Sequence, residues 1–488
     1  MQWDRRTGLS LVLALTLATP AFAQQQTPPA PSAPREAKIP QPVERTLENG
    51  LRVIVIPKPD VPLVASRLLF KTGAEADPAG REGLAALTSS VLTTGTKTRT
   101  AEQIARGIEA LGATLDASAG WDNSTIDVSV LSSNFTNAMT FVADVARNPT
   151  FAKDEFDRER AQAIDAVQVS LQEPRPLAGL VASRVLFGSS PYAHAVSGTP
   201  VSLDRIKREE LSKFHSSYYR PDNAVWIVGG DVKADAVFEL AQKLFGSWPR
   251  GTAPKAATEA AETQAAAGPR VVVIDMPEAG QAAVIVNRRG IRRSDPLLYQ
   301  ALVTNSVLGG GYSARLNQEI RIKRGLSYGA GSSFDPRREV GPFMATTQTK
   351  NESAAEVVGI IADEMKRLSQ SDVPEAELTP RKAVLIGGFA QSLETSEGIV
   401  DRVSTLALHG MPLTDINKYI SSVQAVSAED VRKFASANFG SDANVVIVGN
   451  ASQFVTPLRA RFQNVEVIPR DELDLDSPTL RRQRKEKQ

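Results

Sequence analysis

The sequence predicts an α+β protein built from two homologous α/β sandwich domains, and two observations lead to this fold class. The first is an internal repeat, because residues 214–229 (FHSSYYRPDNAVWIVG) align with residues 434–449 (FASANFGSDANVVIVG) at an offset of 220. The second is that each copy mixes short apolar strand patterns with longer helical patterns. One α+β domain has therefore been duplicated within the chain.

Individual elements follow from local patterns of apolar residues. Strands are expected at RVIVI (52–56), STIDVSVL (124–131) and AVWIVGG (224–230), and helices at AEQIARGIEALGA (101–113) and AAEVVGIIADEMKRL (354–368). Thr100 and Gln103 predict a capping box, in which the threonine accepts from a first-turn amide and the glutamine reaches back. The first of these helices should therefore begin at residue 101.

Composition shifts divide the chain into its expected parts. Residues 250–269 are rich in Ala, Thr and Glu and contain no large apolar residue, which predicts a linker between domains at 44–249 and 270–470. Residues 471–488 are assigned to a basic tail, because its end, LRRQRKEKQ, carries five basic residues in nine positions. A solvated segment is expected there.

The N-terminus has the layout of a signal peptide at residues 1–23. Arg5 and Arg6 precede an apolar run from Leu9 to Ala18, and Ala-Phe-Ala at 21–23 forms a cleavage site. The run is shorter than the ~20 apolar residues that span a bilayer, so no stable membrane anchor is expected. Residues 24–43 follow as a Pro-rich leader. We expect export to the periplasm of a Gram-negative cell, with full secretion as the alternative.

Composition also excludes several classes of function. The formal net charge of +1 predicts no nucleic-acid partner, and 42% hydrophobic residues allow large cores. The chain contains no Cys, which rules out disulfides, thiolate metal ligands and a Cys nucleophile. Stability must therefore come from packing.

The segment GLAALTSSVLTTGT (83–96) resembles the metal-binding helix of pitrilysin-type zinc metallopeptidases, the inverzincins. That helix reads roughly G-L-A-H-x-x-E-H-x-x-x-x-G-T, with two His that bind zinc and a Glu that activates water. Ala86, Ser89 and Ser90 occupy these positions here. Residues 48–87 and 189–231 extend the resemblance on both sides of the motif, so that it covers nearly the whole chain after the leader.

The resemblance places the third zinc ligand, a Glu, seven residues after a Glu-Arg pair. Glu159-Arg160 is present, but the ligand position is Ala166. A shift of one residue brings up Asp165, yet one carboxylate without two imidazoles makes no tetrahedral site. The resemblance therefore implies no metal and no cofactor in this chain, with zinc bound by a partner that has an intact H-x-x-E-H helix.

The remaining polar candidates favour structural roles. No two of the three His, at 194, 215 and 409, lie within four residues of each other, which argues against a His-based zinc site. His194 stands in a loop before a predicted helix, and the other two occupy helical patterns as partly exposed residues. Ser89 and Ser90 have no His or Lys nearby in sequence to activate them as nucleophiles.

In the second copy, residues 308–334 (LGGGYSARLNQEIRIKRGLSYGAGSSF) resemble the family segment whose Arg, and Tyr seven residues later, face the zinc site. Arg321 and Tyr328 have this spacing, and such a pair can stabilise the oxyanion formed in peptide hydrolysis. Taken alone, Arg321 would be a solvated helix charge and Tyr328 a half-buried strand residue. Gly309, Gly310 and Gly311 are assigned to a turn at a helix end.

Two functions follow from these residues. The first is a metal-free subunit, inactive alone, of a heterodimeric zinc endopeptidase that acts on peptides. It is similar to the non-zinc subunit of heterodimeric bacterial peptidases of this family and to mitochondrial processing peptidase-like proteins. The resemblance implies that the two domains form half of a clamshell, which the partner completes. The alternative is a non-catalytic structural or peptide-binding homologue that forms its own dimer.

Overall fold

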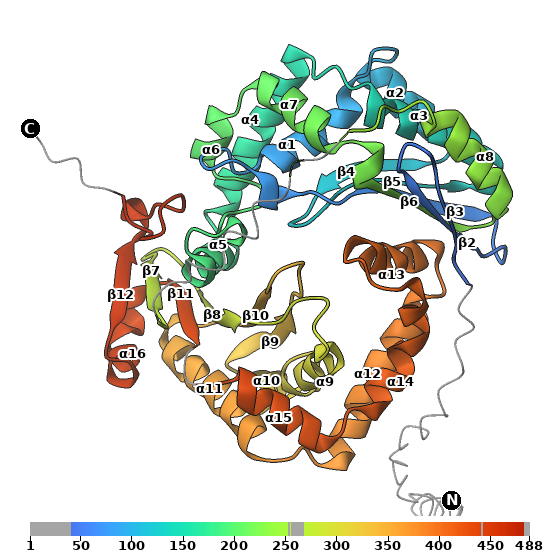
Figure 1. Cartoon of the computed structure of the whole chain (residues 1–488). Coiled ribbons are helices and arrows are strands. Elements are labelled where there is room, and N and C mark those ends of the chain that lie inside the picture. The colour runs from blue at the N-terminus through green and yellow to red at the C-terminus, as the bar shows by residue number, and fades with distance from the viewer. Residues whose placement is uncertain (1–40, 252–253, 255–267, 441–442, 483–488) are drawn as a thin grey trace, which may run out of the picture. The chain divides into compact units, whose positions relative to one another are not determined.

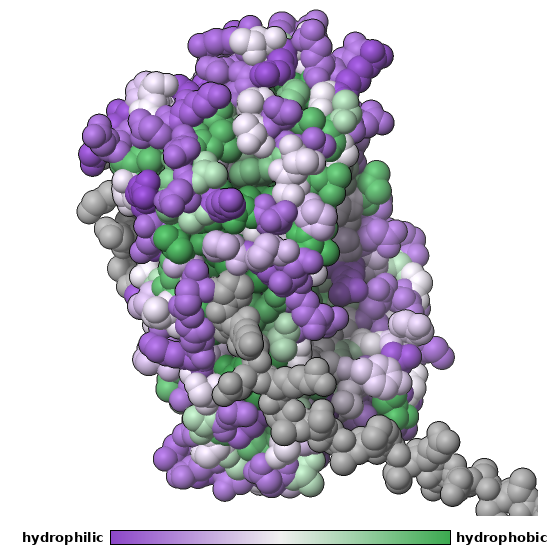
Figure 2. Space-filling view, turned by 90° about the vertical axis from the view of Figure 1, so that its right-hand side faces the viewer, coloured by the Kyte–Doolittle hydropathy of each residue, from purple (hydrophilic) through white to green (hydrophobic). Residues whose placement is uncertain are grey.

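The computed structural model describes residues 41–251, 254, 268–440 and 443–482. The signal peptide, most of the leader and most of the linker lie outside the described residues, so the predicted domain boundaries stay predictions. No helix of the described part is long and apolar enough to cross a bilayer. In Figure 2, hydrophilic residues cover most of the face shown, and hydrophobic residues lie among them in small groups.

Two six-stranded mixed sheets form the framework, which confirms the predicted fold class (Figure 1). The first sheet has the order β1-β2-β6-β3-β5-β4, and the second has the order β12-β7-β11-β8-β10-β9. The strands of the first sheet are β1 (Val43–Thr46), β2 (Arg52–Pro57), β3 (Leu63–Phe70), β4 (Thr114–Ala119), β5 (Ser124–Leu131) and β6 (Ala224–Gly230). Those of the second are β7 (Val271–Asp275), β8 (Ala282–Arg289), β9 (Ser327–Phe334), β10 (Pro342–Thr349), β11 (Asn444–Gly449) and β12 (Val465–Pro469).

The internal repeat is visible in the elements themselves. Helix α7 (Arg208–Tyr218) precedes β6, and α15 (Ala428–Asn438) precedes β11, so the two helices begin 220 residues apart, as do the two strands. Each of these strands runs parallel to its neighbour on one side, β2 or β7, and antiparallel to β3 or β8 on the other. The duplication predicted from the sequence is therefore a duplication of sheet topology.

The outermost strand differs between the copies. In the first sheet β1 forms an antiparallel hairpin with β2, whereas in the second sheet β12 pairs in parallel with β7. In the second copy a further strand, β12, follows the aligned strand β11 in the sequence. In the first sheet the outer backbone partner of β2 is the preceding strand β1. In the second sheet the outer backbone partner of β7 is β12, so the edge of neither strand is left unpaired.

Helices surround both sheets. Those of the first half are α1 (Leu84–Val91), α2 (Ala101–Ala110), α3 (Phe135–Arg147), α4 (Lys153–Ser170), α5 (Pro174–Phe187), α6 (Pro200–Arg205), α7 and α8 (Ala234–Phe245). Those of the second half are α9 (Leu298–Leu308), α10 (Arg315–Asn317), α11 (Ala354–Gln370), α12 (Glu375–Ser392), α13 (Ser396–Leu408), α14 (Tyr419–Ala425), α15 and α16 (Val455–Arg461). The helices expected at 101–113 and 354–368 correspond to α2 and α11.

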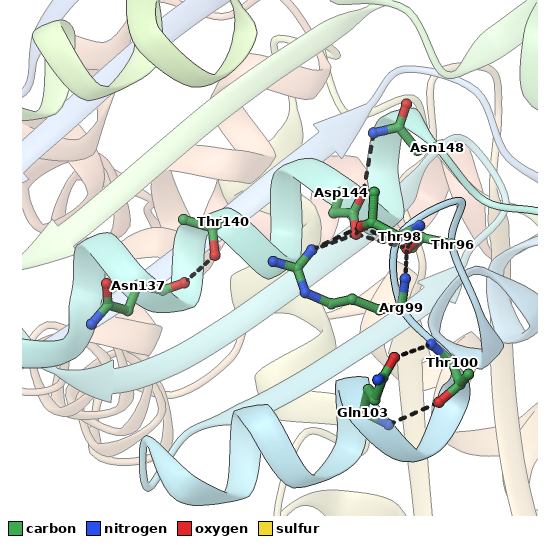
Figure 3. Close-up of polar contacts among 9 residues, drawn as sticks. All are labelled: Thr96, Thr98, Arg99, Thr100, Gln103, Asn137, Thr140, Asp144 and Asn148. Carbon is green, nitrogen blue, oxygen red and sulfur yellow. Dashed lines mark hydrogen bonds and ion pairs between the residues drawn. The ribbon is translucent and has the colours of Figure 1, made fainter.

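The predicted capping box at the start of α2 is present (Figure 3). The Gln103 amide donates to Thr100 Oγ1 at 3.3 Å, and the Thr100 amide donates to Gln103 Oε1 at 3.0 Å. Nearby, Asp144 on α3 accepts hydrogen bonds from Thr96 Oγ1 at 2.7 Å and from Thr98 Oγ1 at 2.8 Å (Figure 3). The loop between α1 and α2 is thus fixed to α3 by polar contacts.

The two halves exchange equivalent helices. Helix α5 belongs to the first half of the sequence, but Leu177, Val181 and Val185 pack into the core cluster formed by β7, β8 and β11 of the second sheet. Helix α13 belongs to the second half, and its apolar residues pack on β2, β3 and β6 of the first sheet. Each sheet therefore buries one face against a helix from the other half of the chain.

A polar contact also joins the halves, through the loop between β9 and β10. The Arg338 guanidinium donates to Glu75 Oε1 at 3.1 Å and to the carbonyl oxygens of Lys71 and Asp122, each at 2.9 Å. The Arg338 amide donates to Asp122 Oδ2 at 2.8 Å. The Glu75 side chain is fully buried, so this loop is inserted into the first half and is not merely resting on it.

The C-terminal segment corrects one expectation. LRRQRKEKQ was expected to be a solvated tail, but Leu480 is fully buried in the core cluster that contains α5. Arg481 donates to the Val467 carbonyl at 2.9 Å and lies 3.2 Å from Glu472 Oε2. The described part of the predicted tail therefore folds back onto β12, and residues 483–488 lie outside the described residues.

The helix exchange predicts that a cavity in α5 weakens the whole fold. Leu177→Ala removes a side chain that is 1% exposed, and such truncations cost about 2–5 kcal/mol. Urea denaturation should show this loss in the free energy of unfolding. The matched control is Val384→Ala at an exposed position of α12, which should change the value by less than about 0.5 kcal/mol. Equal effects of the two substitutions would contradict the described packing of α5.

The buried Glu75 predicts a pH dependence of stability. Burial raises the pKa of Glu75 to about 7, although Arg338 opposes the shift. The carboxyl group has a pKa of about 4.3 in the unfolded chain, so from about pH 4.3 to 7 the native state binds more protons. The contribution of Glu75 to stability is therefore complete below that window and is lost as pH rises through it.

Glu75→Gln removes this titration, so the variant should gain stability relative to the wild type between pH 5 and pH 8. Urea denaturation at each pH measures the difference, and taking the difference cancels the other titrating groups. The control is Glu109→Gln at an exposed position. Its free energy of unfolding should change with pH in the same way as that of the wild type. A constant difference between Glu75→Gln and the wild type would show that Glu75 is ionised over the whole range.

Candidate site at the substituted metal positions

Helix α1, which carries the motif, is fixed at its first turn by a buried carboxylate. The Asp77 side chain accepts hydrogen bonds from the amides of Gly83 and Ala85, both at 2.8 Å. Gly83 is the N-cap residue with φ of +95°, and a Cβ there would lie 2.9 Å from the Leu203 side chain. Both the left-handed backbone and the close approach require glycine. The helix start, and with it the register of α1, is therefore strongly constrained.

Three of the four substituted metal positions come together in space. Ala86 and Ser90 lie one turn apart on α1, and Ala166 lies on α4, and all three line one cavity of about 380 Å³, the α1–α4 cavity. Asp165, the neighbour considered as a replacement ligand, is exposed and does not line this cavity. Seven residues after Glu159, the spacing therefore identifies Ala166, which lines the cavity beside α1. The neighbouring carboxylate of Asp165 does not line it.

Ser89, at the position of the water-activating Glu, points elsewhere. It is fully buried, and its Oγ lies 2.9 Å from the Tyr219 hydroxyl in the core. Tyr219 follows directly after α7 and stacks on His215, with ring centres 4.9 Å apart. Sequence reasoning did not single out Tyr219, since no local pattern connects it with residue 89. The Ser89 hydroxyl is therefore hydrogen-bonded in the core and does not line the α1–α4 cavity.

A second cavity of about 450 Å³, the β4 cavity, lies beside the first and shares Ala86, Leu180 and Ser197 with it. Its wall includes Ala117, Ser118 and Ala119 of β4 and also His194. The His194 ring nitrogens lie 3.0 and 3.1 Å from the carbonyl oxygens of Ala195 and Ala74. Burial lowers the pKa of His194, although the two backbone carbonyl groups oppose the shift.

The donor set at these positions does not fit zinc. Ala86 and Ala166 offer methyl groups, and the Ser90 hydroxyl donates to the Leu87 carbonyl at 3.0 Å. Within the described residues, no group of three or more His, Cys, Asp or Glu could hold a metal ion. Zinc in proteins requires three or four imidazole, thiolate or carboxylate ligands. The residues at these positions therefore line a cavity where the family has its metal site, but they provide no side chains that can bind zinc.

The half-buried Arg321 and the exposed Tyr328 form a separate group on the second half of the chain. Arg321 lies on the π-helical turn η7 (Gln318–Ile322) and Tyr328 on β9. The guanidinium carbon stands 4.7 Å from the centre of the Tyr328 ring and 5.0 Å from that of Tyr312. The structure brings the two predicted residues together and adds Tyr312, which sequence reasoning passed over inside the segment GGGYSAR.

The exposure of this group corrects the purely structural interpretation of Tyr328. The residue is in a strand, as expected, but it is 88% exposed rather than half-buried, because β9 is an edge strand of the second sheet. Within the described residues, the Arg321 side chain has no ion pair and no hydrogen bond. A cation held between two aromatic rings keeps its hydrogen-bond donors available for an external group.

Comparison with known proteins identifies the family to which the chain belongs. The family described as Insulinase (Peptidase family M16) matches residues 52–196, and the domain described as Peptidase M16 inactive domain matches residues 205–385. The chain therefore belongs to peptidase family M16, the pitrilysin-type metallopeptidases.

The glycines at 309–311 follow α9 directly, as expected for a turn at a helix end.

Relatives cover almost the whole described fold. An uncharacterized zinc protease of Mycobacterium leprae is 28% identical over 86% of this chain and 94% of its own length. A crystal structure of a peptidase M16 inactive domain from Pseudomonas fluorescens has a TM-score of 0.77 and 27% identity, covering 84% of this chain and 98% of that one. A protease from Helicobacter pylori shares the fold, with a TM-score of 0.79 at 21% identity, over 84% of this chain and all of that one.

The convergence of three positions predicts that metal binding can be restored. The triple substitution Ala86→His, Ser90→His and Ala166→Glu places three ligands around one cavity, so the variant should bind about one zinc per chain. Atomic absorption after dialysis measures the metal content, and circular dichroism confirms the fold. The control is the double variant Ala86→His with Ser90→His, which lacks the carboxylate and should bind zinc at least about tenfold more weakly. Equal binding by both variants would show that residue 166 does not face α1.

Proposed function

We propose that this chain is the metal-free subunit of a heterodimeric peptidase of family M16. A partner chain of the same fold, with an intact H-x-x-E-H helix, binds zinc and activates water. This chain completes the substrate site with Arg321 and Tyr328. It is inactive alone, and the two chains together hydrolyse peptides.

The observation that carries this proposal is the state of the Arg321–Tyr328 pair. The guanidinium lies between two tyrosine rings, has no acidic partner among the described residues, and stands beside a tyrosine that is 88% exposed. Contacts with ring faces do not use the N–H donors of a guanidinium, so the five donors of Arg321 stay unpaired within the described residues. The N–H donors of Arg321 are therefore available to a group outside this chain, such as the carbonyl oxygen of a bound peptide.

The chemistry of the pair suits peptide hydrolysis. Attack of water on the scissile carbonyl creates an oxyanion, which the metal on the partner stabilises when bound. A guanidinium presents a rigid fork of N–H donors and a phenol presents one O–H donor, so both can donate to the carbonyl oxygen as its charge grows. The ring contact between Arg321 and Tyr328 holds the two donors on one surface.

Export to the periplasm is part of the proposal. It rests on the signal-peptide layout of residues 1–23, with its A-x-A cleavage site, and on the absence of Cys from the sequence. Cell fractionation followed by N-terminal sequencing of the mature chain tests it. A mature chain that begins near residue 24 in the periplasmic fraction supports export, and a cytoplasmic chain with residue 1 intact overturns it.

Substitutions in the pair should reduce catalysis by the complex. Arg321→Ala and Tyr328→Phe each remove one donor to the oxyanion, for which a loss of ~10²–10³ in kcat is expected. The assay is hydrolysis of a quenched fluorescent peptide by this chain mixed with its zinc-binding partner. Size-exclusion chromatography of each mixture verifies that the complex still forms.

The matched control is Lys323→Ala, which removes a neighbouring cation that is already paired with Glu319 at 2.5 Å. This variant should keep kcat within about twofold of the wild type. If Arg321→Ala and Tyr328→Phe also leave turnover unchanged in an intact complex, the pair has no catalytic role. The alternative of a non-catalytic structural or peptide-binding homologue would then replace the proposal.

A further inference from the structure

A third cavity, of about 890 Å³, lies beside the C-terminal segment (residues 470–482) and is bordered by the end of α4 and by α6 (Figure 1). We call it the C-terminal cavity. Among the described residues, it shares none of its lining with the α1–α4 cavity or the β4 cavity. Its volume lies near the upper end of the range of roughly 300–1,000 Å³ that is typical of ligand pockets. The cavity is therefore a separate candidate site, apart from the substituted metal positions and from Arg321 and Tyr328.

The wall that the C-terminal segment forms is held in place by the rest of the chain. Thr199, the N-cap residue of α6, donates through Oγ1 to the Asp476 carboxylate at 3.0 Å. Arg184 on α5 donates through Nε to the Leu475 carbonyl oxygen at 3.0 Å, and Leu480 is fully buried. These contacts fix the two sides of the cavity relative to each other. The cavity is therefore preformed, and a ligand does not have to order this segment when it binds.

Most of the charged groups on the walls already have partners within the chain. Asp474 accepts at Oδ1 from the Asp476 amide at 3.0 Å, while the Asp476 carboxylate is bound at the start of α6. The Arg470 guanidinium donates to Gln172 Oε1 at 2.7 Å and to the Leu171 carbonyl oxygen at 3.1 Å. These three charged groups stabilise the walls of the cavity.

Arg205 and Arg482 are the exceptions. Both line the cavity and are exposed, and within the described residues neither guanidinium group has an ion pair or a hydrogen bond. Each presents a planar fork of N–H donors, whose geometry matches the two oxygens of a carboxylate. The charged hydrogen-bond donors without a partner on these walls are therefore two guanidinium groups, and the ligand that they favour carries carboxylates.

Aliphatic side chains border the same cavity and restrict the ligand further. They belong to Leu171, Val201, Leu473 and Leu475. Val201, on α6, is 50% exposed, so a ligand that covers it removes apolar surface from water. An inorganic anion would pair with the two arginines but would leave this surface exposed, and an uncharged aliphatic molecule would leave the arginines without partners. A ligand that satisfies both features has carboxylates next to an aliphatic group.

We infer that the C-terminal cavity binds an acidic segment of a partner protein, in which carboxylates flank an aliphatic side chain. The carboxylates pair with Arg205 and Arg482, and the aliphatic side chain covers Val201. The volume of about 890 Å³ favours a segment of chain over a single small acid. This site goes beyond the proposed function, because it requires neither zinc nor the pair of Arg321 and Tyr328.

The test uses the full chain and a peptide with the sequence Gly-Asp-Leu-Asp-Gly, which is blocked at both ends and labelled with an uncharged fluorophore. Fluorescence anisotropy should give a Kd at least about tenfold lower than for the same peptide with Asn in place of both Asp, because the amides lose the charge-assisted hydrogen bonds. A peptide with Ser in place of Leu should bind at least about fivefold more weakly, because it buries less apolar surface.

The double variant Arg205→Gln with Arg482→Gln should raise the Kd of the Asp-Leu-Asp peptide by at least about tenfold. Both side chains are exposed and without partners among the described residues, so the fold should be unaffected, and a thermal denaturation curve verifies this. The matched control is Arg208→Gln, which removes an exposed arginine that lies 3.5 Å from Glu209 and does not line the cavity. This variant should keep the Kd within about twofold of the wild type.

Three results would overturn the inference. Equal affinity for the Asp and Asn peptides, or an unchanged Kd in the folded double variant, would show that the two arginines do not recognise carboxylates. Displacement of the peptide by an equal concentration of inorganic phosphate would show that the cavity is a site for a free anion. Arg321→Ala should bind the peptide as tightly as the wild type does, so failure of this inference and failure of the proposed function are separate outcomes.

Discussion

The exchange of α5 and α13 between the two halves is the packing on which the rest of the structure depends. Each sheet has one face that would expose a row of Val and Ile side chains, and the helix that covers it comes from the opposite half. Burial of apolar surface is the main favourable term in folding, so neither half has a complete core without the other. Helix α5 also provides Leu180 to both cavities, which ties the candidate site to the same packing.

The substituted metal positions agree with the physical cost of keeping a metal site without a metal. Two imidazoles and one carboxylate on the wall of the α1–α4 cavity, without a metal, would leave polar groups partly desolvated and without partners, which costs free energy. Methyl groups at 86 and 166 remove this cost, and the hydroxyl of Ser89 is satisfied by Tyr219 at 2.9 Å. Arg321 and Tyr328 lie apart from these positions, on η7 and β9 of the second half of the chain.

Much of the fold could be predicted because its signals are local. The capping box at Thr100 and Gln103 and the three predicted strands β2, β5 and β6 depend on residues close together in sequence, and the repeat can be found by aligning the two copies. The helix exchange could not be predicted, because the apolar residues of α5 show that it is buried but not which sheet it covers. The burial of Leu480 was missed for a related reason, since the charges that follow it dominate the composition.

The candidate site was predicted in part. Helical spacing placed Ala86 and Ser90 on one side of α1, and the distance from Glu159-Arg160 identified Ala166, which shares their cavity. The inward direction of Ser89 depends on Tyr219, 130 residues away, and the contribution of Tyr312 depends on the path of the chain before η7. Contacts of this kind are set by tertiary packing, which a single sequence does not record.

The central claim is that catalysis requires this chain and a zinc-binding partner together. The measurement that tests it most directly is hydrolysis of a quenched fluorescent peptide library by this chain, by a co-expressed homologue with an intact H-x-x-E-H helix, and by their mixture, with zinc measured in each. The account predicts zinc in the homologue only and turnover in the mixture only. Full turnover by the homologue alone, unchanged when this chain is added, would contradict it.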